Sequence, residues 1–404
     1  MTASRPGRRW PRSGKDRIHD DPRRLGTMPA RVLVVGGGVI GLSCAWQLAH
    51  AGHDVTVLAP APGRDGASWV AAGMLAPVTE VQFGEAALTA LLLEGSRQWP
   101  TFAAGLEAAA GQAIGFDQSG TLTVALDASD RAALDDLLSY QHRLGCTAQR
   151  RSASECRALV PALTPTLSGG IEVPGDHQVD NRALLAALLT AGQRAGVRFV
   201  AGQAAVLSSG PNGPSGPSVT TTEGDRLGSD VVLLAAGVGT PSIDGLEGAG
   251  LPEIRPVKGH ILRLGQTAAA PLLNRTVRAL VHGRSVYLVP RADGSVVVGA
   301  TVEERGADST VQAGAVHQLL SDARAVVPGL DELELREAQA GLRPATADNA
   351  PCIGWTDLPG VAVASGHYRN GILLAPLTAA AVVALLADQP LDPLLADLAP
   401  AIAR

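Results

Sequence analysis

The chain has 404 residues, 46% of them hydrophobic and 18% charged, with a formal net charge of -5. This length exceeds the size at which a single core usually stops growing, so it predicts two domains, and the acidic balance argues against nucleic-acid binding. The cysteines lie far apart and lack Cys-x-x-Cys pairing, which predicts neither a metal site nor a disulfide framework and fits a reducing cytoplasm.

Residues 1–29 are rich in Arg, Pro, Gly and Asp and have no apolar periodicity, which predicts a disordered N-terminal tail. The tail lacks the apolar core of a signal peptide, and Asp16, Asp20 and Asp21 argue against a transit peptide. Met28, just before the first expected strand, is an alternative start of the protein.

A glycine-rich turn follows that strand. Residues 32–35 are an all-apolar run, typical of a strand buried on both faces. Gly36, Gly38 and Gly41 then have the Gly-x-Gly-x-x-Gly spacing, in which the first glycine makes the tight turn, the second lets a pyrophosphate approach and the third packs the helix on the strand. With a second strand expected at 54–58, this βαβ unit predicts a diphosphate bound at a helix N-terminus.

The acidic residue that usually binds the ribose should end this second strand, but the chain has Ala59-Pro60 there. The ribose contact is therefore left open. A small-residue loop follows at 66–77, where backbone can approach a ligand closely.

Along the rest of the chain, hydrophobic residues recur in some segments at the spacing of a helix and in others at the spacing of a strand. Helices are expected at residues 85–110, 129–144, 179–189 and 372–386, and strands at 120–126, 197–207, 230–239, 255–264, 285–291, 295–302 and 361–364. Ser129 and Asp180 are the expected N-caps, and Asp293-Gly294 predicts a hairpin. The last helix is predicted to be buried rather than to span a membrane, with Pro376 in its first turn.

Because βαβ pieces flank an all-β stretch, we predict an α/β chain of the two-domain α+β kind. Seven motifs sharpen this prediction: the glycine triplet, Val70-Ala-Ala-Gly-Met-Leu75, Pro174-Gly-Asp-His-Gln-Val-Asp180, Val257-Lys-Gly259, Tyr287-Leu-Val-Pro-Arg291, Gly341-Leu-Arg-Pro344 and Gly366-His-Tyr-Arg-Asn-Gly-Ile-Leu-Leu374. In this order they resemble the D-amino-acid oxidase superfamily of FAD amine oxidases, and most closely the bacterial glycine oxidases of thiazole (thiamine) biosynthesis.

The resemblance implies a discontinuous Rossmann-like FAD-binding domain and a substrate domain built on an antiparallel sheet. The implied limits are 30–80, 166–250 and 336–404 for the FAD-binding domain, and 81–165 and 251–335 for the substrate domain.

The resemblance also implies the cofactor contacts. Gly36, Gly38 and Gly41 would hold the FAD pyrophosphate. The flavin would be lined by Ala71, Ala72, Gly73 and Met74, the adenine by Val206, and the flavin pyrimidine edge by backbone N–H groups of Asn370, Gly371 and Ile372; Gly237, His367 and Arg369 complete the implied FAD site.

We expect the FAD to be bound without a covalent bond. The monomeric sarcosine oxidases, which the chain resembles distantly, attach their flavin to a cysteine just before a Thr-x-Asp segment. Here Thr346-Ala-Asp348 is preceded by Gly341-Leu-Arg-Pro-Ala345, which contains no sulfur, and Cys352 follows in an apolar run.

On the substrate side, an amino acid needs its carboxylate fixed, and a planar guanidinium does this with two parallel hydrogen bonds. Arg343, in an expected Gly-Leu-Arg-Pro turn, is the predicted anchor, with Tyr287 as its hydroxyl partner. The alternatives are a surface arginine and a core tyrosine. Arg369 is either a second anchor or a positive charge beside the flavin, and His367 is either structural or functional.

No general base is required if the amine binds neutral, since hydride transfer to the flavin then gives an imine, and dioxygen reoxidises the flavin to give hydrogen peroxide. The predicted substrate is glycine, sarcosine or a small D-amino acid, and the imine hydrolyses or passes to a thiazole synthase. A quinone-linked D-amino-acid dehydrogenase and a non-catalytic flavoprotein subunit are the competing hypotheses. We expect no membrane partner; a homo-oligomer is compatible with the sequence, which leaves the oligomeric state open.

Overall fold

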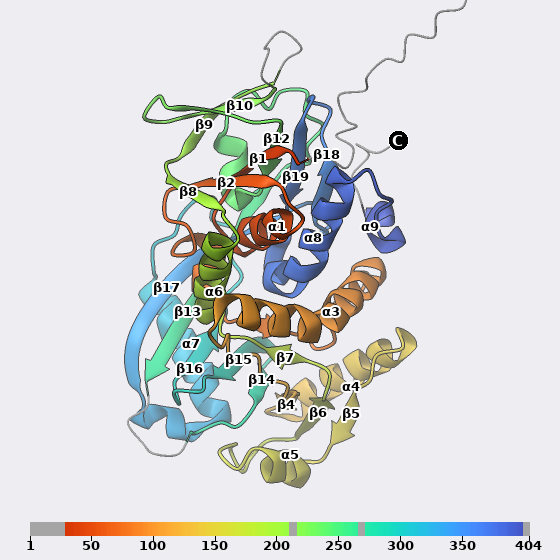
Figure 1. The fold of residues 1–404 in the computed structure, drawn as a ribbon. Coiled ribbons are helices and arrows are strands. Elements are labelled where there is room, and N and C mark those ends of the chain that lie inside the picture. Colours follow the sequence, from red (N-terminus) through yellow and green to blue (C-terminus); the bar gives the residue numbers. More distant parts are fainter. Residues whose placement is uncertain (1–28, 210–215, 266–270, 399–404) are drawn as a thin grey trace, which may run out of the picture.

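The computed structural model describes residues 29–209, 216–265 and 271–398 (Figure 1). The predicted tail, apart from Pro29, lies outside the described residues. The helices are α1 (Val39–His50), α2 (Gly66–Val70), α3 (Ala86–Ala110), α4 (Ala128–Arg143), α5 (Ala153–Leu159), α6 (Asn181–Arg194), α7 (Ala313–Val326), α8 (Gly371–Leu386) and α9 (Pro393–Leu398), with 3-10 helices η1 (Gly237–Ser242), η2 (Pro328–Glu332) and η3 (Tyr368–Asn370).

A six-stranded sheet forms the upper part of the molecule in Figure 1. Its order is β18 (Cys352–Trp355), β19 (Val361–Ser365), β12 (Val231–Leu234), β1 (Arg31–Val35), β2 (Asp54–Ala59) and β8 (Arg198–Ala201). All neighbours are parallel except the edge pair of β18 and β19. The carboxyl ends of the central strands therefore meet at one edge, where such sheets bind ligands.

The two faces of this sheet are covered differently. Val32 and Val34 face a core shared with α1, α3, α6 and α8. Leu33 and Val35 face a second core shared with the three-stranded sheet of β9 (Ala204–Ser208), β10 (Ser218–Thr221) and β11 (Arg226–Gly228). This double burial explains why the first strand is apolar at successive positions.

An eight-stranded sheet forms the lower part. Its order is β17 (Glu334–Ala345), β13 (Arg255–Gly265), β16 (Val296–Gly299), β15 (Arg284–Pro290), β14 (Thr276–Val281), β4 (Thr121–Ala125), β6 (Gly169–Val173) and β5 (Gln149–Arg151). One pair, β14 with β4, is parallel and the others are antiparallel. Two short strands, β3 (Met74–Leu75) and β7 (His177–Gln178), pair separately. The predicted mixed fold class is confirmed.

The domain limits stay a prediction. Two strands from segments predicted for the FAD-binding domain, β6 and β17, belong to the eight-stranded sheet because they extend its ladders. Conversely, α3, from a segment predicted for the substrate domain, packs in the core of the six-stranded sheet.

Several expected elements differ in the structure. The strand expected at 197–207 is two strands, because the chain leaves β8 at Gly202 and enters another sheet as β9. The strands expected at 230–239 and 295–302 end early, at Leu234 and Gly299. The predicted turn at Arg343 is wrong, since this residue lies inside β17, paired with Val257.

The predicted burial of α8 is confirmed. The segment Tyr368–Leu386 is apolar and long enough to cross a membrane. However, 67% of its apolar stretch is buried inside the molecule, as in the core helix of a globular protein. Trp99 of α3 donates its indole N–H to the carbonyl of Leu373 at 2.8 Å. The helix begins at Gly371, so Pro376 lies past the first turn, contrary to the prediction.

The N-caps divide into one correct and one wrong prediction. Asp180 caps α6 by accepting the N–H groups of Arg182 and Ala183. In contrast, α4 begins at Ala128 and is capped by Asp127, which accepts the N–H of Asp130, so Ser129 lies inside the first turn.

Asp127, Asp130 and His282 form a group that could hold a metal ion, but all three are already in hydrogen bonds with one another.

Asp127→Ala should lower the free energy of unfolding by about 1 kcal/mol through the loss of the cap of α4. Ser129→Ala is the matched control and should change it by less than about 0.5 kcal/mol. Urea denaturation followed by circular dichroism measures both. Equal effects of the two variants would contradict the assignment of the cap.

Candidate active site

A cavity of about 680 Å³ lies between the two large sheets. One wall is the carboxyl edge of the six-stranded sheet, with Ala59 at the end of β2, Gly36 directly after β1 and Gly237 shortly after β12. The opposite wall is the eight-stranded sheet, which contributes Tyr287 and Arg343. All of the predicted site residues line this cavity except Gly41 and Val206.

The glycine turn is shaped by close backbone approach. Gly36 has φ of 123°, and a Cβ there would lie 2.3 Å from the carbonyl oxygen of Ala235 on the neighbouring strand. A Cβ on Gly41 would lie 2.0 Å from the carbonyl oxygen of Gly36, so this glycine packs α1 on the turn, outside the cavity. Gly38 is the N-cap of α1 and has no side chain that could fill the space in front of the helix. The N-terminus of α1 therefore fits a diphosphate.

Ser68 was missed by the sequence reasoning. Its hydroxyl oxygen accepts the N–H of Val39 at 3.0 Å, at the first turn of α1. It belongs to the small-residue loop, whose composition was the available signal.

The adenosine end of the cavity is lined by backbone and one polar side chain. Gly202 donates its N–H to the carbonyl of Ala59, so Gln203 lies beside the residue where a ribose-binding acid was expected. Val206, which the resemblance places at the adenine, does not line the cavity: it lies on β9, two residues beyond Ala204, and is 37% exposed. The break between β8 and β9 turns the chain out of the six-stranded sheet at this point.

The loop from Ala71 to Met74 forms a side wall. A Cβ on Gly73, which has φ of 73°, would lie 2.0 Å from the carbonyl oxygen of Val179. Arg263 donates to the carbonyl of Ala71 at 3.3 Å, and Arg291 donates to the carbonyl of Ala72 at 2.7 Å. Two arginines of the eight-stranded sheet thus fix this loop, a role that sequence reasoning did not assign to them.

The N-terminus of α8 closes the cavity at the other end. Asn370 is its N-cap and is 3% exposed, and its amide Nδ2 has no hydrogen-bond partner among the described residues. Gly371 and Ile372 follow as the first residues of the helix. An unpartnered buried donor beside a helix N-terminus fits the pyrimidine edge of a flavin.

Arg343 and Tyr287 lie on the wall of the eight-stranded sheet. The guanidinium of Arg343 occupies the space over Gly259, where a Cβ would come within 2.3 Å of its nitrogens. Its Nη1 donates to the carbonyls of Lys258 and Thr301, at 3.3 and 3.2 Å. These acceptors are neutral, so the positive charge of Arg343 is left for an anionic ligand.

Burial raises the pKa of the Tyr287 hydroxyl to about 12, so it stays protonated and can donate a hydrogen bond. It faces Gly299 across the strand pair β15–β16, and a Cβ at that position would collide with the hydroxyl. The phenol therefore has space to turn into the cavity rather than into the core.

Arg369 lies in the wall but is paired with two carboxylates. Its Nε is 3.1 Å from Glu80, and its Nη2 is 3.0 Å from Glu85. Glu80 also binds Arg278 at 2.5 Å. Burial alone would raise the pKa of Glu80, but Arg278 and Arg369 outweigh it and hold the carboxyl pKa below its ordinary value. This neutralised cluster makes Arg369 a weaker candidate than Arg343 for binding the substrate carboxylate.

His367 is buried in the same wall, with Nε2 2.9 Å from the hydroxyl of Thr378. Burial lowers its pKa to about 3, so it remains neutral at physiological pH. A role in positioning fits this environment better than proton transfer.

The fold and the cavity define a dinucleotide-dependent oxidoreductase, with a nucleotide turn on one sheet and a cationic ligand site on the other. The chain belongs to the FAD dependent oxidoreductase family, whose model matches residues 31–385. The geometry described above fits this cofactor at the glycine turn, the 71–74 loop and the N-terminus of α8.

Individual relatives are similar over most of the chain. The glycine oxidase of Geobacillus kaustophilus is 32% identical over 88% of this chain and 92% of its own length, and its crystal structure matches with a TM-score of 0.83, 31% identity and coverage of 92% and 98%. The bifunctional protein ThiO/ThiG of Nostoc sp. is 32% identical over 91% of this chain. The chain spans 54% of that relative's length.

His367→Gln should reduce the pH dependence of stability. The folded-state pKa of His367 is lowered, so the unfolded chain binds a proton that the folded chain does not. Its contribution is present above pH 6.5 and is lost as the pH falls towards 3, by about 1.4 kcal/mol per unit. Between pH 7 and 5, the free energy of unfolding of the wild type should therefore fall by about 2 kcal/mol more than that of the variant. Thr378→Val, which keeps the histidine, should retain the wild-type slope; parallel slopes for all three proteins would refute the argument.

Denaturation in acid should release the FAD into the supernatant. The four cysteines, Cys44, Cys146, Cys156 and Cys352, are free and buried, and none lines the cavity. Burial raises the pKa of Cys352 to about 12, which keeps its thiol protonated and unreactive. A yellow pellet after centrifugation would show a covalent bond.

Proposed function

We propose that this chain is an oxidase that deaminates glycine, or another small amine such as sarcosine or a small D-amino acid, with FAD and dioxygen. The observation that carries the proposal is Arg343, which lines the cavity with Tyr287, donates to two neutral carbonyls and forms no ion pair with the residues that the structure describes. The similarity to the glycine oxidase of Geobacillus kaustophilus supports the same substrate class.

The residues of the chain orient the substrate. The guanidinium of Arg343 receives the carboxylate through paired hydrogen bonds, and the Tyr287 hydroxyl donates a further one. Ile261 and Met74, which also line the cavity, exclude water from the α-carbon. Fixing the carboxylate directs the α-hydrogen, and this positioning supplies much of the rate.

FAD, when bound, supplies the hydride acceptor and passes the electrons to dioxygen, which becomes hydrogen peroxide. The backbone N–H groups of Gly371 and Ile372 hold positive potential at the N-terminus of α8, which favours developing negative charge nearby. Burial lowers the pKa of His367 to about 3, which makes its imidazole a very weak base, and Glu80 is ion-paired. The proposed mechanism therefore uses neither as a general base and has the amine bind unprotonated.

The proposal extends to the fate of the product. The similarity to bifunctional ThiO/ThiG proteins, which this chain spans to about half of their length, supports transfer of the imine to a separate thiazole synthase in the cytoplasm. Free imine hydrolyses to the keto acid and ammonia.

Oxygen uptake with glycine, sarcosine, D-alanine and D-proline tests the activity. We expect rapid peroxide formation with at least one of them. Reduction of an artificial dye without oxygen uptake would indicate a quinone-linked dehydrogenase instead, and no reaction would indicate a non-catalytic subunit.

Arg343→Ala should retain FAD but lose at least about a hundredfold in kcat/KM, because charge-assisted hydrogen bonds contribute ~1.5–3 kcal/mol each. Arg343→Lys should recover little, since an ammonium cannot make the paired contact. The matched control is Arg336→Ala, on the exposed half of the same strand, which should leave kcat/KM near the wild-type value. Turnover close to wild type in Arg343→Ala would place the carboxylate elsewhere.

A further inference from the structure

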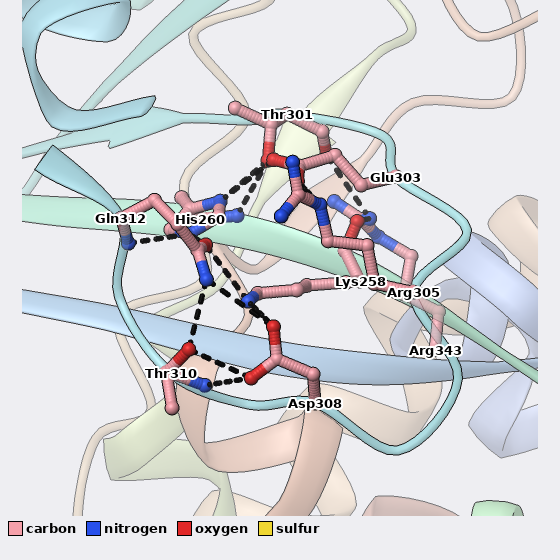
Figure 2. Close-up of polar contacts among 9 residues, drawn as sticks. All are labelled: Lys258, His260, Thr301, Glu303, Arg305, Asp308, Thr310, Gln312 and Arg343. Carbon is pink, nitrogen blue, oxygen red and sulfur yellow. Dashed lines mark hydrogen bonds and ion pairs between the residues drawn. The ribbon is translucent and has the colours of Figure 1, made fainter. Parts of the chain in front are cut away.

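A buried lysine lies directly behind Arg343. Lys258, on β13, has a side chain that is 0% exposed, with its ammonium 2.8 Å from Asp308 Oδ2 and 2.8 Å from Gln312 Oε1. Figure 2 shows these three side chains pointing toward one another. A buried ammonium costs several kcal/mol unless it is paired, and apolar residues often replace such pairs without loss of stability. This pair is therefore a candidate for a specific structural task.

The task is indicated by what Lys258 and its neighbours hold. Residues 301–312 contain no helix or extended strand and run from the end of β16 to the N-cap of α7. Lys258 exchanges backbone hydrogen bonds with Glu303, at 2.8 and 3.0 Å, and its ammonium fixes Asp308 and Gln312 further along. Backbone and side chain of a single residue thus fix both halves of the segment.

His260 makes a second connection to the same segment. It is buried two residues along β13, with Nδ1 2.7 Å from the hydroxyl of Thr301 and Nε2 2.9 Å from Gln312 Oε1 (Figure 2). Gln312 therefore contacts both Lys258 and His260, which links the start of the segment to its end.

The segment reaches Arg343 at Thr301 and the cavity at Val302. The carbonyl of Thr301 and the carbonyl of Lys258 are the two acceptors of Arg343 Nη1. Val302, the next residue, lines the cavity. The guanidinium is thus held by two carbonyls, one of Lys258 itself and one of the segment that Lys258 and His260 bind.

We propose that Lys258 is a positioning residue for substrate recognition: its buried ammonium fixes the 301–312 segment on β13, and the carbonyls of Lys258 and Thr301 then direct Arg343 at the substrate carboxylate. The inference rests on the proposed function only in that a carboxylate is bound by Arg343. If the proposal is correct, loss of the Lys258 ammonium weakens carboxylate binding only because it disturbs Arg343, and it has no effect on binding when Arg343 is absent.

The test measures acetate binding to the FAD-loaded enzyme from the change in flavin absorption, and the kinetics with glycine. Lys258→Met, with an apolar side chain of similar length, should raise the acetate Kd and the glycine KM about tenfold or more, with a smaller change in kcat. The matched control is Glu304→Gln. Glu304 lies on the same segment and forms an ion pair with Arg255, and its loss should leave the acetate Kd and the glycine KM near the wild-type values.

A double-mutant comparison separates positioning from general damage. In the Arg343→Ala background, Lys258→Met should lower the residual kcat/KM no further. If Lys258→Met does not fold, Asp308→Asn, which keeps the shape and removes the charge of the partner, should give a smaller rise in the same two values.

Three results would overturn the proposal. The first is acetate binding in Lys258→Met and Asp308→Asn as tight as in Glu304→Gln. The others are a further loss of kcat/KM when Lys258→Met is added to Arg343→Ala, and acetate binding that Arg343→Ala does not weaken. An enzyme that binds acetate through Arg343 and Lys258 but oxidises none of the four amines would refute the proposed function and keep the positioning role.

Discussion

The contact on which the active site depends is the one between the eight-stranded sheet and the 71–74 loop, made by Arg263 and Arg291. Both arginines extend from the eight-stranded sheet and donate to carbonyls of the 71–74 loop, and both reach Oδ1 of Asn181, at 3.2 and 3.4 Å. Burial lowers the pKa of Arg263 to about 10 and lowers that of Arg291 as well. Hydrogen bonds to the loop carbonyls and to Asn181 offset this cost and fix the loop beside the cavity.

The charges around the cavity are distributed unevenly, and this difference gives the site its chemistry. Arg278 and Arg369 share Glu80, whereas Arg343 forms no ion pair within the described part of the chain and donates to the carbonyls of Lys258 and Thr301. Glu80 follows backbone N–H groups that are fixed by the buried carboxylate of Asp176, so its position does not depend on a ligand. An anion entering the cavity therefore finds one guanidinium that is not already neutralised, which is a basis for selectivity as well as affinity.

The sequence predicted the features whose physics is local. Gly36 and Gly41 were predicted from a spacing that close backbone contact requires, and Asp180 from the ordinary preference for an acidic N-cap. Features set by distant partners were missed or wrong. Gly-Leu-Arg-Pro has the composition of a turn, but pairing with β13 extends it as a strand. Val206 was placed at the adenine by the resemblance; in the structure the chain changes sheets at Gly202, and Val206 is not among the residues that line the cavity.

The resemblance supplied roles that local pattern could not, but not the supports behind them. Lys258 was noted only as part of a Val-Lys-Gly motif, and its partners Asp308 and Gln312 lie 50 and more residues away. No periodicity connects these positions, because the segment that carries them has no regular structure.

Three glycines of the eight-stranded sheet leave space for ligand-binding side chains on its cavity-facing side. Gly259 faces Gly341 across β13 and β17, and Gly299 faces Tyr287 across β16 and β15. Glycine in a strand interior weakens the strand and typically marks a close approach. Here a Cβ at 259 would displace Arg343, one at 299 would displace Tyr287, and one at 341 would lie 3.0 Å from Val70 of the opposite wall. The sheet therefore lacks side-chain packing at these three glycines. The space that they leave allows Arg343 and Tyr287 to face a ligand from within the sheet.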